Sequence, residues 1–543
     1  MLAAVAGLGF AAVNLPGFAR FRFALGRPAE TQRRLLRAYL ERNRETAFGR
    51  EHGFARLRSY EDFAAAVPPR SYDELEPWVL RAARGEPRVL SADAVLRLEP
   101  TSGSTRAAKW IPYTAGLQAE LRRAVAPWLC DLVRREPGLA LGRAYWSVSP
   151  AAGFAPTPPE GTVVPVGFED DTAYLGGLAQ RLAAATLAVP STVRHVADVE
   201  SFRYVTLLFL LQARDLALVS VWHPSFLTLL LEALPRHFER LVADLRAGTL
   251  GPPEALPVSV AAPLQARLRP APRRAAEIAR AGPLDVAAIW PRLRVVSAWA
   301  EAHAALPAAQ LRRRLGSRVR IEPKGLLATE ACVSIPWGER RVLAVRSHLF
   351  ELEQADGRLV PAERAEDGGE YAVVVTTAGG LWRYRMHDRV RVRGFVGRAP
   401  ALEFLGKQDH VCDRRGEKLH EAFVAAALGP LLAAAGARFA LLAPEEDERG
   451  CGYTLFVELE ASPGPSVGLA LEAEAALCAN PHYAHARRLG QLRALGLFVV
   501  ARGGEEAWLR RATADGRRAG DVKPLLLSPR DDWAGLLEGR RPR

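Results

Sequence analysis

Apolar and polar residues follow one another in blocks along the chain, and the spacing inside each block predicts an element. The stretch that begins at Ala29 (AETQRRLLRAYLERNRETAFGREHGF) places Leu36, Tyr39 and Leu40 on one stripe with charges opposite, which predicts an amphipathic helix. Three later segments are apolar throughout or alternate, and predict strands: 293–299 (LRVVSAW), 371–377 (YAVVVTT) and 388–396 (DRVRVRGFV). Helical patterns lie between these strands, so the main body is expected to be α/β.

Two longer apolar stretches raise the question of a membrane. The first, residues 1–19, has no positively charged start, is broken by Asn14 and Pro16, and continues into helix-like sequence. A packed or interfacial helix is therefore favoured over an anchor or a signal peptide. The second (YVTLLFLLQARDLALVSVWHPSFLTLLLEAL) is interrupted by charged residues and a proline, so it predicts buried helix and strand of a large core.

A domain boundary is indicated near residues 398–409, where a proline and a glycine precede a set of predicted elements that is enough for a small domain. Five elements are predicted beyond this point, namely helices over 419–435 and 467–477 and strands over 438–442, 453–460 and 495–501. The expected organisation is a large α/β domain over residues 1–405 and a smaller, mobile α+β domain over residues 406–543.

Composition narrows the possible partners. The 543 residues carry a net charge of +13, but Arg, Asp and Glu are interleaved and no block of like charges stands out. Diffuse positive charge suits an enzyme for anionic substrates at least as well as a nucleic-acid binder, which ranks last. The five cysteines show no CxxC spacing, so neither a disulfide framework nor a zinc site is indicated, and a cytoplasmic location is predicted.

Lysine is rare in this chain, which makes its positions informative. Only five of the 73 basic residues are lysine: Lys109, Lys324, Lys407, Lys418 and Lys523. A compact ammonium is a different chemical tool from a planar guanidinium. Each lysine is therefore a candidate functional residue.

Lys109 ends a run rich in hydroxyl groups, Thr101 to Lys109 (TSGSTRAAK). Such a loop can turn backbone N–H groups and hydroxyls toward phosphate oxygens, with the ammonium beside them. The spacing is not GxxxxGK[ST], so a P-loop nucleotide hydrolase is not indicated.

This loop resembles the phosphate loop of the adenylate-forming superfamily. Further segments narrow the resemblance to the auxin-responsive-promoter (Gretchen Hagen) family of acyl-acid amido synthetases, in order from about Ala29 to beyond Glu421: AFGREHGF, VPPRSYDELEPWVLRAARGEPRVL, IWPRLRVVSAWAEA, KGLLATEACVSIPW and TTAGGLWRYRMHDRVRVRGF. A bacterial member of the family is expected.

The resemblance implies roles for individual residues. It places the nucleotide on Thr101, Ser102, Gly103, Ser104, Thr105, Lys109, Thr329 and Asp388, with Asp388 accepting hydrogen bonds from the ribose. Glu330 matches the glutamate associated with Mg²⁺, and Lys523 matches the mobile catalytic lysine. Lys407, Asp409 and Lys418 fall in the hinge, beside the acidic Glu421.

The chain departs from the family pattern at several positions. Leu326 and Leu327 stand where the superfamily often has an aromatic residue for adenine, and His387 replaces the usual glycine before Asp388, so a different local turn is expected. Arg383 and Arg385 could face phosphate or pair with carboxylates; for Arg385 the carboxylate pair is favoured.

The implied reaction uses ATP and Mg²⁺ to adenylate a carboxylic acid, after which an amine, typically an amino acid, displaces AMP. The acid pocket is expected near Trp222, His223 and Phe226, although core roles for these residues are favoured. A thiol acceptor and a non-catalytic relative remain alternatives. No nucleic-acid partner and no firm membrane association are predicted, and the oligomeric state is left open.

Overall fold

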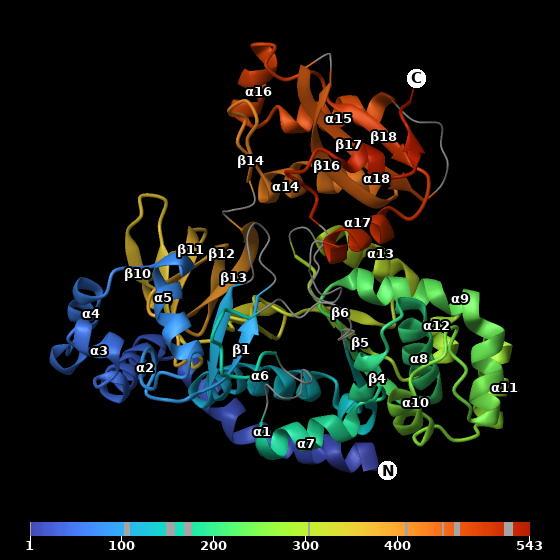
Figure 1. The fold of residues 1–543 in the computed structure, drawn as a ribbon, viewed down its shortest axis with the longest axis horizontal. Coiled ribbons are helices and arrows are strands. Elements are labelled where there is room, and N and C mark those ends of the chain that lie inside the picture. The colour runs from blue at the N-terminus through green and yellow to red at the C-terminus, as the bar shows by residue number, and fades with distance from the viewer. Residues whose placement is uncertain are drawn as a thin grey trace.

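The structure is a computed structural model of the 543-residue chain. It describes residues 2–101, 109–147, 158–167, 176–301, 304–407, 411–447, 450–460, 467–514 and 525–542. Figure 1 shows a broad large domain with a smaller C-terminal domain above it, and the N-terminus on the opposite side of the large domain.

One half of the large domain is a parallel sheet with helical crossovers, as the apolar strand patterns predict. The strands are β3 (Arg143–Trp146), β4 (Leu216–Ser220), β5 (Val295–Ala298) and β6 (Arg320–Pro323), adjacent in that order. The associated helices are α7 (Gly177–Thr186), α8 (Val199–Gln212), α9 (Pro224–Ala247), α10 (Val258–Gln265), α11 (Pro272–Ala281), α12 (Val286–Ile289) and α13 (Ala305–Leu315). The long apolar stretch thus forms α8, β4 and the start of α9, within one buried cluster.

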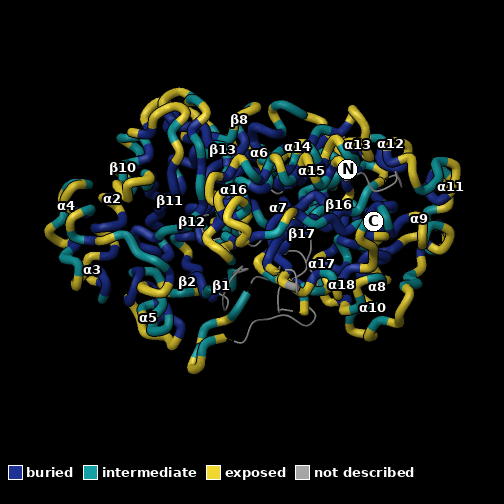
Figure 2. Tube along the Cα trace, turned by 90° about the horizontal axis from the view of Figure 1, so that it is seen from above, coloured by how far each residue is buried: buried dark blue, intermediate teal, exposed yellow. Residues whose placement is uncertain are grey.

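The other half is an antiparallel sheet of order β10-β9-β11-β12-β13-β8-β7. Its strands are β7 (Ser334–Trp337), β8 (Arg340–Leu343), β9 (Leu349–Glu353), β10 (Leu359–Pro361), β11 (Glu370–Thr376), β12 (Tyr384–Val396) and β13 (Ala399–Lys407). The predicted strands over 371–377 and 388–396 correspond to β11 and part of β12. Figure 2 shows the buried residues concentrated along β11 and β12, with exposed turns toward α3 and α4 at the edge.

Helices from the N-terminal part of the chain and a short hairpin complete the large domain. The helices are α1 (Leu2–Leu25), α2 (Pro28–Asn43), α3 (Ala47–Glu51), α4 (Tyr60–Ala66), α5 (Tyr72–Ala83) and α6 (Ala115–Arg135), and the hairpin is β1 (Val95–Pro100) with β2 (Trp110–Thr114). In α2, Leu36, Tyr39 and Leu40 are buried, which confirms the predicted amphipathic helix.

The small domain has mixed α+β structure, as predicted. A four-stranded sheet holds β16 (Ala437–Asp447), β17 (Gly450–Leu459), β18 (Gly496–Val500) and β19 (Gly539–Arg540), and β14 (Val411–Cys412) pairs with β15 (Leu419–His420). The helices are α14 (Glu421–Ala434), α15 (Val467–Leu477), α16 (Pro481–Arg488), α17 (Gly504–Ala514) and α18 (Trp533–Leu536). The predicted domain boundary between residues 405 and 406 lies within β13.

Contacts of the small domain with the large one include two sets of polar interactions, at α17 and at α13. At the start of α17, Glu505 hydrogen-bonds with Ser225, and Glu506 lies 3.6 Å from Arg203 and 3.8 Å from Arg236. On α13, the side-chain amide of Gln310 donates to the backbone carbonyls of Ala437 and Arg438. These contacts hold the domain orientation seen in Figure 1.

The apolar N-terminal stretch forms α1, which contacts α6 and α7 along the large domain. By length and composition, its Ala3–Leu25 segment is the one helix among the described residues that could cross a membrane. One face is nevertheless packed into the fold, because Phe18 and Phe21 lie 5.0 and 5.2 Å from the ring of Trp337.

Candidate active site

The hydroxyl-rich loop leaves from the β1–β2 hairpin. The backbone N–H of Thr101 donates to the carbonyl of Lys109 at 2.9 Å, so the two ends of the loop are held together. Ser102, Gly103, Ser104 and Thr105 lie outside the described residues. The described part therefore fixes where the predicted phosphate loop begins and ends.

Lys109 lies between two tyrosines. Its Nζ donates to the hydroxyl of Tyr384 at 3.3 Å and lies 5.9 and 5.8 Å from the ring centroids of Tyr72 and Tyr384. Both rings are fixed, since Tyr384 is fully buried and the Tyr72 hydroxyl accepts from the N–H of Trp110 at 2.7 Å. The ammonium is thus held by cation–π attraction at the mouth of the loop.

Glu330 belongs to the same neighbourhood. It lies on a tight turn in which Leu327 bridges Cys332 and the N–H of Ala328 donates to the carbonyl of Ala331. Burial, together with the charges of Glu76 and Glu330, raises the pKa of Tyr72, so the Glu330 carboxylate is close enough to act on that hydroxyl. Thr329 is half-buried on the same turn.

Asp388 is placed by an irregularity in β12. Ala372 pairs with Arg389 and Val374 with Arg385, so three residues of β12 lie opposite one residue of β11. Such bulges re-aim side chains next to active sites. His387, inside the bulge, has φ = +61°, the region that glycine favours. The backbone at His387 therefore keeps a glycine-type conformation despite the side chain, at some cost in strain.

The hinge region begins directly beside Asp388. Asp388 is opposite Lys407 in the β12–β13 pairing, and Lys407 Nζ lies 3.6 Å from Asp388 Oδ1. Gly406 has φ = +138°, and a Cβ there would lie 2.9 Å from the Cβ of Ala422 on α14, so a larger residue has no room. The predicted ribose ligand and the start of the hinge are therefore in direct contact.

Of the remaining residues predicted for the hinge and for catalysis, the structure describes Lys418. Lys418 is exposed in the small domain, where its carbonyl accepts from Asn480 at 3.4 Å. Asp409 and Lys523 lie outside the described residues.

The segment that follows Lys523 is nevertheless anchored. The carboxylate of Glu421 accepts from the backbone N–H groups of Leu526 and Leu527 at 2.9 and 2.5 Å. The N–H of Leu442 also donates to the carbonyl of Leu526 at 2.6 Å. Burial raises the pKa of Glu421 to about 7, although these hydrogen bonds oppose the shift.

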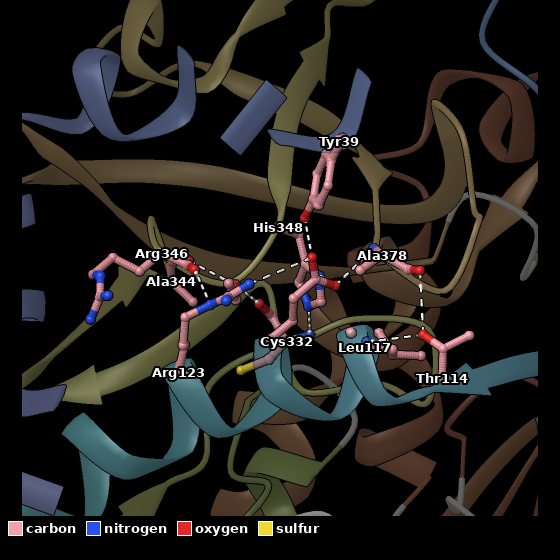
Figure 3. Close-up of polar contacts among 12 residues, drawn as sticks. Tyr39, Thr114, Leu117, Arg123, Cys332, Ala344, Arg346, His348 and Ala378 are labelled. Carbon is pink, nitrogen blue, oxygen red and sulfur yellow. Dashed lines mark hydrogen bonds and ion pairs between the residues drawn. The ribbon is translucent and has the colours of Figure 1, made fainter. Parts of the chain in front are cut away.

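A buried polar network connects the elements of the site. Glu120 on α6 is fully buried and accepts hydrogen bonds from the Tyr39 hydroxyl, from His348 Nδ1 at 2.9 Å and from the Ala378 N–H at 2.9 Å. Figure 3 shows Tyr39, His348 and Ala378 converging on this point from three parts of the chain.

The network also fixes the protonation of His348. Its Nε2 accepts from the backbone N–H of Cys332 at 3.1 Å, so the ring proton is assigned to Nδ1, which donates to Glu120. Cys332 closes the turn that carries Glu330. Sequence reasoning missed Glu120 and His348 because buried polar residues from distant segments leave no local pattern.

Lys324 is buried at the carboxyl end of β6. Its Nζ donates to Ser220 Oγ at 2.6 Å and lies 5.5 and 5.3 Å from the ring centroids of Trp128 and Trp222. Ligands of open α/β sheets bind at the carboxyl ends of the strands. His223, by contrast, caps α9 through Ser225, as expected of a satisfied core histidine.

Both arginines of the RYRMHD segment pair with carboxylates. Arg385 contacts Glu353 at 2.8 Å, as favoured from the sequence, and Arg383 contacts Glu351 at 2.7 Å in a buried ion pair. Of the two alternatives for Arg383, the structure supports the pair with a carboxylate over a contact with phosphate.

Solved structures share this fold. A solved acyl acid amido synthetase named GH3.15, in complex with 2,4-DB, superposes with a TM-score of 0.85 over 98% of this chain and 97% of that chain, at 18% identity. A 2-hydroxyisobutyryl-CoA ligase in the postadenylation state superposes with a TM-score of 0.52 over 93% and 90% of the two chains, at 13% identity. The fold is that of the adenylate-forming enzymes.

The family follows from the sequence. The models of the GH3 family N-terminal, central and C-terminal domains match residues 18–318, 343–407 and 417–531. This chain belongs to the GH3 family, which confirms the predicted resemblance.

Curated relatives are consistent with this membership. A rice (Oryza sativa subsp. japonica) protein named probable indole-3-acetic acid-amido synthetase GH3.12 is 26% identical over 94% of this chain and 92% of its own length. An Arabidopsis thaliana protein named indole-3-acetic acid-amido synthetase GH3.2 is 32% identical over 20% of this chain and 18% of its own length. Because these relatives are plant proteins, a bacterial origin stays a prediction.

Proposed function

We propose that this protein is an ATP-dependent acyl-acid amido synthetase. Three family domains in order, in a chain whose curated relatives are named amido synthetases, support this proposal most strongly. The substrates are a carboxylic acid and an amine, in the first place an amino acid. The five cysteines, all free thiols, suit a cytoplasmic setting.

In the first step, a carboxylate oxygen attacks the α-phosphorus of ATP, and the bond from that phosphorus to pyrophosphate breaks. The loop from Thr101 to Thr105 and the ammonium of Lys109 bind the phosphates. The acceptor-only carboxylate of Asp388 binds the ribose hydroxyls. Lys523 precedes the Leu526–Leu527 segment that Glu421 holds, and its role would be to bring a cation to two anions that otherwise repel each other.

Magnesium fits the donor set as a phosphate-bound ion. No group of three or more potential metal ligands occurs among the described residues. Mg²⁺ on nucleotides needs only one or two carboxylates besides phosphate and water oxygens. Glu330, with Thr329 beside it, would supply the protein side, and the ion when bound neutralises phosphate charge.

In the second step, the amine nitrogen attacks the acyl carbon, the bond to the AMP oxygen breaks and the nitrogen loses a proton. The small domain rotates between the steps, as the hinge at Gly406 and Lys407 permits. Because Lys407 Nζ lies 3.6 Å from Asp388 Oδ1, a movement at Lys407 would change the charge beside the proposed ribose ligand.

The acid is expected near Trp222 and Lys324, at the carboxyl ends of the parallel strands. Indole and aryl acids come first as candidates because curated relatives are named indole-3-acetic acid-amido synthetases. An aromatic acid would find Trp222 as a stacking partner.

The test is pyrophosphate release with ATP, magnesium and a panel of aryl, indole and fatty acids, with hydroxylamine to trap the acyl-adenylate. We expect release with one class of acid. Folded protein that binds ATP but releases no pyrophosphate across the panel would support a non-catalytic relative. Transfer to coenzyme A in preference to every amino acid would support a thioester-forming ligase.

A further inference from the structure

Helix α1 exposes an unusual set of apolar side chains. Val5, Leu8, Leu15 and Phe23 are 63%, 54%, 57% and 62% exposed. Leu8 and Leu15 are seven residues apart, and Phe23 is eight residues beyond Leu15, so the three side chains lie on one stripe of the helix. Exposed alanines lie between them on the same stripe. A contiguous apolar surface of this length on a soluble protein marks an interaction site.

The opposite face holds the helix to the large domain. A Cβ at Gly7 would collide with the backbone of Ala140, so the helix approaches that segment as closely as glycine allows. Phe21 is fully buried against Trp337. Crossing a membrane would expose these contacts, whereas lying flat on one leaves them intact.

Positive charge borders the apolar stripe. The described part of α1 contains Arg20 and Arg22, both exposed, and no acidic residue. Arg346 is close enough to Arg20 to feel its charge, because burial and the charges of Arg123, Arg20 and Arg34 lower the pKa of Arg346. The C-terminal half of the helix therefore carries two exposed arginines, Arg20 and Arg22, beside an apolar face.

We propose that the outward face of α1 docks on an anionic lipid surface. Val5, Leu8, Leu15 and Phe23 would enter the boundary between headgroups and acyl chains, and the flanking arginines would meet lipid phosphates. The proposal does not depend on the reaction that the enzyme catalyses.

The position of α1 agrees with such docking. Figure 1 shows α1 on the side of the large domain that faces away from the C-terminal domain. A membrane on this face leaves the small domain free to rotate. The enzyme would then work at the surface of the lipid, where apolar acids concentrate.

A second copy of this chain fits the same surface less well. In a two-fold dimer the same patch faces itself, and a dimer with parallel α1 helices would bring Arg20 and Arg22 of the two copies together. Like charges at an interface disfavour association. An anionic surface instead neutralises them.

The test is sedimentation of the full-length protein with vesicles of phosphatidylcholine alone or with phosphatidylglycerol as the minority lipid. We expect binding to the anionic vesicles, weakened by salt, and little binding to the neutral ones. Leu8→Gln combined with Leu15→Gln should reduce binding at least about tenfold. Arg20→Glu combined with Arg22→Glu should remove the preference for phosphatidylglycerol.

The control is Leu284→Gln, at a leucine that is 79% exposed in the segment between α11 and α12, which should bind as the unchanged protein does. ATP binding in solution verifies that each variant is folded, and the arginine variant keeps the test decisive if the leucine variant unfolds. No binding to anionic vesicles at low salt would overturn the proposal. So would concentration-dependent dimerisation that the leucine variant abolishes while vesicle binding stays unchanged.

Discussion

At the scale of single residues, the account depends most on Asp388. The bulge in β12 and the strained backbone at His387 place this carboxylate beside Lys407. Asp388→Asn should raise the KM for ATP about tenfold or more, since hydrogen bonds to a charged acceptor contribute roughly 1.5–3 kcal/mol. Steady-state pyrophosphate release measures it, with the exposed Asp356→Asn as control. An unchanged KM would remove Asp388 from the nucleotide site.

A substitution of Lys324 tests whether the carboxylic acid binds near this residue. Lys324→Met keeps an unbranched side chain, one atom shorter, between Trp128 and Trp222 but removes its charge. We expect the KM for the acid to rise about tenfold, the KM for ATP to stay within about twofold, and the fold to persist. Equal changes in both constants would show that Lys324 supports the site as a whole and does not select the acid.

Glu421 gives a pH dependence with a definite sign. Its folded pKa is raised from 4.5 to about 7, so the protonated form is favoured in the native state, and its contribution to stability is lost as the pH rises through that range. The shift corresponds to about 3 kcal/mol.

Glu421→Gln cannot titrate. Unfolding in urea measures the free energy of unfolding of both proteins. As the pH rises from 4.5 to about 7, the unchanged protein should lose stability relative to this variant. A difference independent of pH would contradict the burial argument.

At the scale of elements, the sequence predicted what local patterns encode. The stripe of Leu36, Tyr39 and Leu40 predicted α2, and the apolar run 371–377 predicted β11, because burial imposes the period of the element. The position of Lys109 at the end of a hydroxyl-rich run also predicted a phosphate loop from local sequence alone.

Long-range contacts were not predictable in this way. Tyr72 and Tyr384, which hold Lys109, are separated from each other by more than half of the chain, and Glu120 meets His348 across 228 residues. Tertiary packing brings such residues together, and no spacing within one element encodes it. The coupling of Lys407 to Asp388 likewise appears only through strand register.

The contact of α17 with the large domain contributes modestly to the docking of the small domain. Side chains of Glu506 and Arg236 are 43% and 48% exposed, so their ion pair is weak, whereas Arg203 is 10% exposed. Glu506→Gln should weaken docking by about 1 kcal/mol or less. Small-angle X-ray scattering should then show a larger radius of gyration, with the exposed Glu472→Gln on α15 as control. A more compact variant would contradict the role of this contact.

At the scale of the whole molecule, the chain combines a rigid site on the large domain with a small domain that carries Lys523. The proposed first half-reaction would need both, while ATP binding would need mainly the large domain. The buried network around Glu120 and His348 holds the large-domain part together, and the predicted hinge at Gly406 would supply the movement. This division explains how one chain could catalyse two successive displacements on the same acyl group.

The most direct measurement follows the oxygen that the first step transfers. With an accepted acid labelled with heavy oxygen in its carboxylate, and with ATP and an amino acid, the account predicts an amide and AMP that carries one labelled oxygen. ADP and phosphate as the nucleotide products, or AMP without label, would contradict an acyl-adenylate and with it the proposed function.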